Sequence, residues 1–192
     1  MRQFISAFIL VAFLVSVSSV NFAQQPKKPR PSLKASVSQT IGIDANIKID
    51  YSRPGVKGRK IWGDLVPFGL SPVDKESKGK PFPWRGGANE NTTIEFSQDV
   101  LVNGNKLSAG KYGLHFIPSE KDWVVIFNKK NDQWGSYTYN QDEDALRITV
   151  TPVKAHHQEW LMYGFDDLTI NSTIAFLHWE QLKVPFKISL PE

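Results

Sequence analysis

The feature that most constrains the fold is a hydrophobic period of two residues, which recurs along most of the chain. Between residues 43 and 51, Ile, Ala, Ile, Ile and Tyr alternate with Asp, Asn, Lys and Asp. Successive side chains of a β-strand point to opposite faces, so this pattern indicates a strand with one buried and one wet face. The same alternation returns at residues 146–151 and 182–190. In the last of these, Pro185 lies on the outer phase and indicates an edge strand, because proline cannot donate a ladder hydrogen bond.

Other short segments that are rich in β-branched or aromatic residues are further predicted strands. They are separated by turn-forming pairs such as Asn103-Gly104 and Ala109-Gly110. These segments are residues 92–97, 99–104, 111–118, 122–129, 135–139, 159–165 and 172–180. No window keeps an apolar stripe at helical spacing for about ten residues. About ten or eleven short strands without helices predict an all-β fold, either an antiparallel β-sandwich or a jelly-roll-like barrel.

The N-terminal 23 residues have the pattern of a secretory signal peptide. A basic Arg2 precedes an apolar run from Phe4 to Val17, and small residues lead to a cleavage site after Ala23. The run is short for a membrane span of about 20 residues, and two serines interrupt it. We therefore expect a secreted or periplasmic protein with no stable membrane insertion after cleavage.

The remaining chain divides into a leader and one domain. Residues 24–32, QQPKKPRPS, contain three prolines and no apolar side chain, which predicts a flexible leader. Residues 33–190 are long enough for a single domain with a sizeable core. The sequence has no cysteine, which excludes disulfides, thiol catalysis and thiolate metal sites. A net charge of +4 over 192 residues is too small to indicate a nucleic-acid-binding surface, so we expect no nucleic-acid partner.

One long irregular region, residues 52–91, interrupts the predicted strands. Loops beyond about 12–15 residues are uncommon in compact domains unless they are functional or disordered. Its middle, residues 71–83, has the polar, proline-punctuated composition of an exposed insertion. Its flanks carry aromatic, glycine and charged residues that can pack while presenting polar groups. The flanks are therefore the predicted functional site.

Four segments resemble the signature runs of the Domain of Unknown Function 2911 family. They are IDYSRPGVKGRKIWGDLVPFG, WRGGANENTTIEFS, LSAGKYGLHFIP and WGSYTYNQDEDALRITVTP. The resemblance extends from about Leu33 to Ile188. It implies one intact domain and export, since members usually follow a signal peptide and occur mostly in Bacteroidetes and related bacteria. It implies no particular activity, and residues 71–83 depart from the shorter pattern of simpler members.

The flanks predict a non-catalytic binding protein, with a cationic and aromatic cleft for a small anionic or saccharide-like ligand. Guanidinium forks and backbone N–H groups suit a carboxylate or phosphate, and Trp62 and Trp84 offer faces for a ring. The predicted ligand-binding residues are Arg53, Lys57, Arg59, Trp84, Arg85, Asn89, Glu90, His115 and Trp134. The hypothesis requires that Arg53, Arg59, Arg85 and Glu90 line one concave pocket. In the alternative interpretation, Arg53 or Arg85 pairs with Glu90 or Asp64 and pins the loop to the sandwich.

Two other functions are open at this point. A protein-interaction or structural module of the cell envelope predicts an exposed apolar patch or an unpaired edge strand. A hydrolase or lyase would use Glu90 as acid or base, His115 as a proton shuttle or metal ligand, and an arginine as an electrophilic clamp. It requires that Glu90 and His115 lie within hydrogen-bond reach of one point. The sequence contains no nucleotide-binding, esterase-elbow or zinc-protease motif. We therefore expect no cofactor and no metal site.

Four tryptophans lie in or beside predicted strands, and packed sheets would bury them. They are Trp123, Trp134, Trp160 and Trp179. Trp134 is the possible exception, because it lies at a loop-to-strand junction from which its ring would face the arginine-rich loop.

Overall fold

The alternating segments form ten β-strands in a computed structural model, which describes residues 28–191. In chain order the strands are β1 (Leu33–Ile41), β2 (Ala45–Arg53), β3 (Thr93–Phe96), β4 (Val100–Val102), β5 (Asn105–Leu107), β6 (Gly110–Ile117), β7 (Trp123–Asn128), β8 (Asp144–Val150), β9 (Val153–Asp166) and β10 (Ser172–Ser189). Two short 3-10 turns, η1 (Lys75–Ser77) and η2 (Gln141–Glu143), complete the regular structure. The predicted signal peptide and the first residues of the predicted leader lie outside the described residues.

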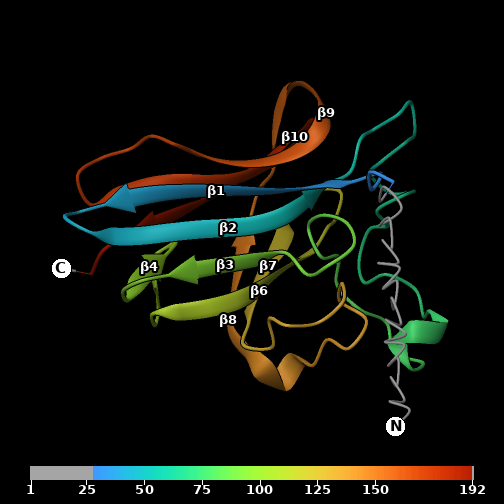
Figure 1. Cartoon of the computed structure of the whole chain (residues 1–192), viewed down its shortest axis with the longest axis horizontal. Coiled ribbons are helices and arrows are strands. Elements are labelled where there is room, and N and C mark those ends of the chain that lie inside the picture. The colour runs from blue at the N-terminus through green and yellow to red at the C-terminus, as the bar shows by residue number, and fades with distance from the viewer. Residues whose placement is uncertain (1–27, 192) are drawn as a thin grey trace, which may run out of the picture.

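The strands make two antiparallel sheets that pack as a β-sandwich (Figure 1). One sheet has the order β1-β2-β3-β6-β7-β8, and the other has the order β5-β4-β10-β9. The predicted all-β fold is confirmed, and of the two predicted architectures the sandwich is the observed one. Within residues 28–191 no helix has the length and apolar character needed to cross a membrane.

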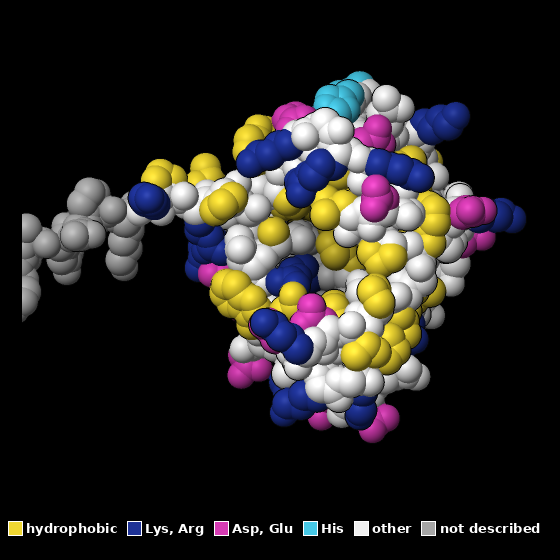
Figure 2. Space-filling model, turned by 90° about the vertical axis from the view of Figure 1, so that its right-hand side faces the viewer, with side chains coloured by type: hydrophobic (Ala, Val, Ile, Leu, Met, Phe, Trp, Pro, Cys, Tyr) yellow, Lys and Arg dark blue, Asp and Glu magenta, His cyan; other side chains and the backbone are white. Residues whose placement is uncertain are grey.

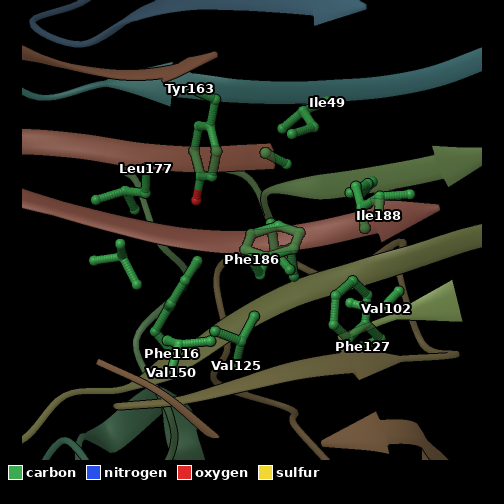
Figure 3. Close-up of a cluster of buried hydrophobic side chains, with 14 of the residues drawn as sticks. Ile49, Val102, Phe116, Val125, Phe127, Val150, Tyr163, Leu177, Phe186 and Ile188 are labelled. Atoms are coloured by element: carbon green, nitrogen blue, oxygen red, sulfur yellow. The ribbon is translucent and has the colours of Figure 1, made fainter. Parts of the chain in front are cut away.

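The core lies between the sheets and uses the inward phase of each strand. Along β2, Ile47 and Ile49 are buried, whereas the alternating Lys48 is exposed. Phe127 on β7 meets Phe186 on β10 across the sandwich with ring centroids 5.9 Å apart, as Figure 3 shows. Burial of each such side chain contributes about 1.5–3 kcal/mol to the free energy of folding. The period of two places these side chains on the inward face of each strand, and their burial stabilises the sandwich.

The long connection between β2 and β3 covers one end of the sandwich, on the right in Figure 1. Isolated β-bridges attach it to the strands: Gly55 pairs with Trp160 of β9, and Trp84 pairs with Phe116 of β6. A third bridge, between Ser71 and Phe82, closes the middle of the connection on itself around η1. These bridges give hydrogen-bond partners to backbone N–H and C=O groups that would otherwise be buried without one, so the connection has a defined path.

Two strand predictions are wrong. Residues 135–139 form turns instead of a strand, because Gly135 has a φ of +61° and the Tyr139 amide donates to the Ser136 carbonyl at 3.0 Å. Pro185 does not mark an edge, since β10 lies between β4 and β9. The proline is accommodated because the β9 ladder ends at Lys183 and the β4 ladder begins at Ile188.

The expectation for the four tryptophans holds for two of them. Trp123 and Trp179 are each 1% exposed, whereas Trp160 is 41% and Trp134 57% exposed. Trp160 points outward from β9, and the Lys57 ammonium lies 5.6 Å from its ring centroid. Trp134 belongs to the turns that replaced the predicted strand, so no sheet covers it.

Gly86 provides a test of how tightly the connection is held. It has a φ of +59°, and a Cβ there would lie 2.5 Å from the ring of Phe116. Gly58 has a φ of +67° with nothing within 4 Å of that position. Both alanine variants carry the left-handed cost of about 1–2 kcal/mol, but only Gly86→Ala adds overlap, which typically costs about 1–3 kcal/mol.

We therefore expect Gly86→Ala to lower the free energy of unfolding by about 1–3 kcal/mol more than Gly58→Ala, as measured by urea titration. Equal losses in the two variants would show that the chain around Gly86 is free to move.

Candidate functional site

A cleft of about 430 Å³ lies where the long connection meets the end of the sandwich. Its lining comes from the connection, from two residues preceding β1 and from β10. The lining residues are Pro31, Ser32, Pro54, Gly55, Lys57, Arg59, Leu65, Val66, Ser71, Phe82, Trp84, Arg85, Gly87, Ala88, Asn89 and Trp179. Figure 2 shows this end of the molecule hollowed near its centre, with Lys or Arg and hydrophobic side chains around the hollow.

The charge of this lining has one sign. Lys57, Arg59 and Arg85 contribute to it, and no aspartate or glutamate does. Figure 2 shows acidic side chains on the same face, some of them close to the hollow, but no aspartate or glutamate belongs to the lining. A concave surface with low-dielectric walls concentrates the field of the charges that line it, so three basic side chains in this lining are suited to an anion more than to a cation.

Arg59 is held by the main chain of its own loop. Its Nε donates to the Val56 carbonyl at 3.1 Å, and its Nη2 donates to the Gly55 carbonyl at 2.6 Å. No ion pair of the described residues includes Arg59. The guanidinium is therefore oriented by neutral acceptors and keeps its full charge for another partner.

Arg85, which lines the same cleft, is held in a similar way. Its Nη1 donates to the Asn89 carbonyl, and its guanidinium carbon lies 5.1 Å from the centroid of the Tyr137 ring. Gly135 makes room for it, since a Cβ at that position would lie 2.5 Å from Nη1. As with Arg59, no carboxylate of the described residues pairs with this side chain.

The apolar part of the lining rests on a cluster of tryptophans. Trp84 and Trp179 line the cleft and stack with ring centroids 6.0 Å apart and an interplanar angle of 17°. Trp62 packs edge-on against both of them and against Trp123. Trp62, whose ring the sequence analysis offers as a face for a ligand ring, is half-buried and is not among the residues that line the cleft. Trp84 is half-buried and remains available from the cleft.

Comparison with known families gives one result. The family model of DUF2911, proteins of unknown function, matches residues 32–188. The chain belongs to the DUF2911 family. No curated protein and no solved structure matches it. The family match spans the sandwich and every part of the cleft except Pro31, so the cleft of this DUF2911 protein belongs to the family domain.

Glu90 does not line the cleft. It lines a separate hollow of about 300 Å³ beside β1 and β2, together with Lys34. Arg30 binds its carboxylate through two hydrogen bonds of 2.9 and 2.5 Å, and Lys34 adds an ion pair at 3.2 Å. The hydrogen bonds from Arg30 are the main cause that lowers the pKa of Glu90 to about 2. Glu90 is thus a charged anchor for the segment before β1.

Arg53 and His115 also lie outside the lining. Arg53 donates from Nε to the Leu161 carbonyl at 2.8 Å, which pins the end of β2 to β9. His115 is fully buried, and its Nδ1 lies 2.7 Å from Ser136 Oγ. Burial, with a smaller contribution from the charge of Arg85, lowers the pKa of His115 to about 3. His115 is therefore a buried neutral residue that packs against the segment between β7 and β8.

Five of the nine predicted ligand-binding residues line one cleft: Lys57, Arg59, Trp84, Arg85 and Asn89. Arg53, Glu90, His115 and Trp134 do not. Arg53, Arg59, Arg85 and Glu90 do not share one pocket, so the cleft as the sequence predicts it is wrong. The observed cleft has a different set of lining residues, in which only Arg59 and Arg85 of these four remain. Arg53 takes the pinning role of the alternative interpretation, but its partners are main-chain carbonyls of β9.

Sequence reasoning missed part of the lining. Phe82 was assigned to an exposed insertion, although an aromatic residue flanked by Pro81 and Pro83 is a signal for packing. Trp179 is buried as predicted, but it also lines the cleft, next to a shift of the strand register between His178 and Glu180 that the local sequence does not indicate. Pro31 and Ser32 were assigned to the leader.

Other site types have less support from the geometry. The described residues contain no group of three His, Asp or Glu that could hold a metal ion. An exposed apolar patch exists at the opposite end of the sandwich, where Ile43, Leu168 and Ile170 are 100%, 58% and 84% exposed. It consists of three hairpin side chains and carries no charge pattern that defines a partner.

The Glu90 anchor predicts a specific pH dependence of stability. Because the folded pKa of about 2 lies below the ordinary value of 4.5, the ionised carboxylate stabilises the fold above pH 4.5. This stabilisation is lost as the pH falls from 4.5 toward 2. The side chain is 37% exposed, so solvent screening limits the effect to about 1 kcal/mol or less.

We expect Glu90→Gln to be less stable than the wild type at pH 7 and equally stable near pH 2, in urea titrations at both values. Glu120→Gln, which removes an exposed carboxylate outside any ion pair of the described residues, is the control and should show no such convergence. A deficit in Glu90→Gln that is the same at both pH values would contradict the role of the carboxylate.

Proposed function

We propose that this protein is a non-catalytic binding protein for a small organic anion that carries a ring, such as a uronic acid or a sugar phosphate. The observation that supports the proposal most is that three basic side chains, Lys57, Arg59 and Arg85, share one cleft with aromatic residues and no acidic residue. A cleft of this size accommodates a ligand of one or two sugar rings.

The arginines favour an anion over a neutral ligand. A guanidinium has five N–H donors, and Arg59 uses two of them and Arg85 one on main-chain carbonyls. The remaining donors suit the paired oxygens of a carboxylate or phosphate, whose charge-assisted hydrogen bonds are stronger than neutral ones. Because the arginines are already oriented, binding an anion orders few side chains.

The aromatic residues favour a ligand with a ring. Trp84 and Phe82 lie in the same lining as the two arginines. A sugar ring placed against them buries its apolar face, while Ser32, Ser71 and Asn89 offer hydroxyl and amide groups for its hydroxyls.

Catalysis is not part of the proposal. Neither residue that a hydrolase or lyase would use lines the cleft: Glu90 lines a different hollow, and His115 is fully buried. We also propose that the protein acts after export, as the signal-peptide pattern of residues 1–23 indicates, where saccharides of the cell envelope are accessible.

The proposal predicts thermal stabilisation by charged sugars. A ligand at about a hundredfold above its Kd adds about 2.7 kcal/mol, which raises the Tm of a domain of this size by about 5 °C or more. We expect glucuronate and glucose 6-phosphate to do this and glucose, at matched ionic strength, to leave the Tm unchanged.

Two variants locate the effect. Arg59→Gln removes a charged donor and should weaken binding by about tenfold or more in calorimetric titration. Gly135→Ala keeps every charge but displaces Arg85, and should also weaken binding. Lys121→Gln, an exposed lysine outside the cleft, should bind like the wild type. If neither charged sugar stabilises the protein, or if glucose does so equally, the proposal is wrong.

A further inference from the structure

A second basic hollow, of about 270 Å³, lies beside the cleft. Its walls come from the turn after η1 and from the segment between β7 and β8. The residues that line it are Ser77, Lys78, Lys80, Pro81, Phe82, Lys130, Tyr137, Thr138, Tyr139 and Asn140. Three of them are exposed lysines, and none is acidic.

One carboxylate, that of Asp144, hydrogen-bonds to a side chain of this lining, and it already has other partners. Asp144 accepts from the Tyr139 hydroxyl at 2.7 Å and from Arg147 Nε at 2.6 Å. No ion pair of the described residues includes Lys78, Lys80 or Lys130. The hollow therefore has the same sign of charge as the cleft and no internal counter-charge.

The two cavities share a wall. Phe82 lines both, and its ring lies 5.0 Å from the ring of Tyr137, which lines the hollow. Tyr137 also contacts Arg85, which lines the cleft: the centroid of the Tyr137 ring lies 5.1 Å from the guanidinium carbon of Arg85. One layer of aromatic side chains thus separates Arg85 from the lysine-lined hollow.

The shared wall is built by local structure. The Ser71 amide donates to the Phe82 carbonyl at 2.8 Å, so the intervening residues return the chain to its starting point. Within them, the Asp74 carboxylate accepts from the Glu76 amide, and Ser77 Oγ accepts from the Asp74 amide, which caps η1. This folded segment places Lys78 and Lys80 next to Phe82, where they add to the charge of Lys130.

We propose that the cleft and the hollow together bind one extended polyanion, an acidic oligosaccharide with anionic groups on both sides of Phe82. This inference rests on the proposed function and adds a second subsite to it. Arg59 and Arg85 bind one acidic unit, and the three lysines bind the next. The rings of Phe82 and Tyr137 lie between the two groups of charges and contact the sugar chain as it crosses. Thr138 and Asn140 supply polar groups for hydroxyls.

Chain length is the variable that tests this inference. We would titrate the wild type with galacturonate and with tri- and hexagalacturonate, following tryptophan fluorescence, since Trp84 and Trp179 line the cleft. A second subsite on the same molecule acts at high effective concentration, so we expect the trimer to bind about tenfold or more tightly than the monomer.

The variant that isolates the hollow combines Lys78→Gln, Lys80→Gln and Lys130→Gln, all at exposed positions. We expect it to keep the wild-type affinity for galacturonate and to lose the gain with chain length. A control that combines Lys106→Gln, Lys121→Gln and Lys187→Gln removes the same charge from exposed positions outside both cavities and should keep the gain. Circular dichroism verifies that both triple variants are folded.

The possible failures are distinguishable. If the wild type binds the monomer and the oligomers equally, the second subsite does not exist but the proposed function stands. If the lysine variant also loses the monomer, the hollow is not a separate subsite and the inference is wrong. If no galacturonate species binds, the inference is wrong, and the measurements with glucuronate and glucose 6-phosphate decide separately whether the proposed function stands. Tighter binding of a single-stranded oligonucleotide with the same number of charges as hexagalacturonate would overturn the assignment to an acidic saccharide.

Discussion

Two main-chain hydrogen bonds between Trp84 and Phe116 hold the long connection onto β6, and the cleft depends on them. The amide of each residue donates to the carbonyl of the other at 2.8 Å. Two residues further on, the buried Tyr163 hydroxyl donates to the Gly86 carbonyl at 2.8 Å. Arg85 lies between these two attachments, so its Cα position is fixed by the sandwich even though it belongs to a long irregular segment. A loop that is anchored in this way can present a charge at a defined place.

The arginines of the molecule differ in what they bind. Arg30 and Arg147 pair with carboxylates, which neutralise them. Arg59 and Arg85 donate to main-chain carbonyls, which orient a guanidinium without cancelling its charge. The positive potential of the cleft follows from this difference, because the small net charge of the whole chain would not produce it.

The period-two pattern was sufficient to predict the all-β fold, because burial of alternate side chains is what the sandwich needs. It failed at residues 135–139, where β-favouring residues follow a glycine in the left-handed region and form turns. It also misplaced Pro185, since the position of a strand within a sheet is set by distant pairings that the local sequence does not contain.

The site was also predictable only in part, from the composition of the long connection. Residues 57–59 and 84–89 contain the three basic side chains and one of the three aromatic side chains that line the cleft, and their composition indicated a site. The ion pair that holds Glu90 outside the cleft was not predictable, because its partner Arg30 lies in a segment with the composition of a flexible leader. Phe82 and the neighbouring lysines were assigned to an exposed insertion, since only the folded chain shows that Ser71 and Phe82 pair.

The central claim is that Arg59 and Arg85 together bind an anion. The most direct measurement is a ¹H–¹⁵N spectrum of the arginine Nε–H groups during titration with glucuronate. The account predicts saturable shifts for Arg59 and Arg85, while Arg53 and Arg147, whose Nε groups bond to Leu161 and Asp144, stay in place. Shifts of similar size at all four arginines, or none at Arg59 and Arg85, would contradict it.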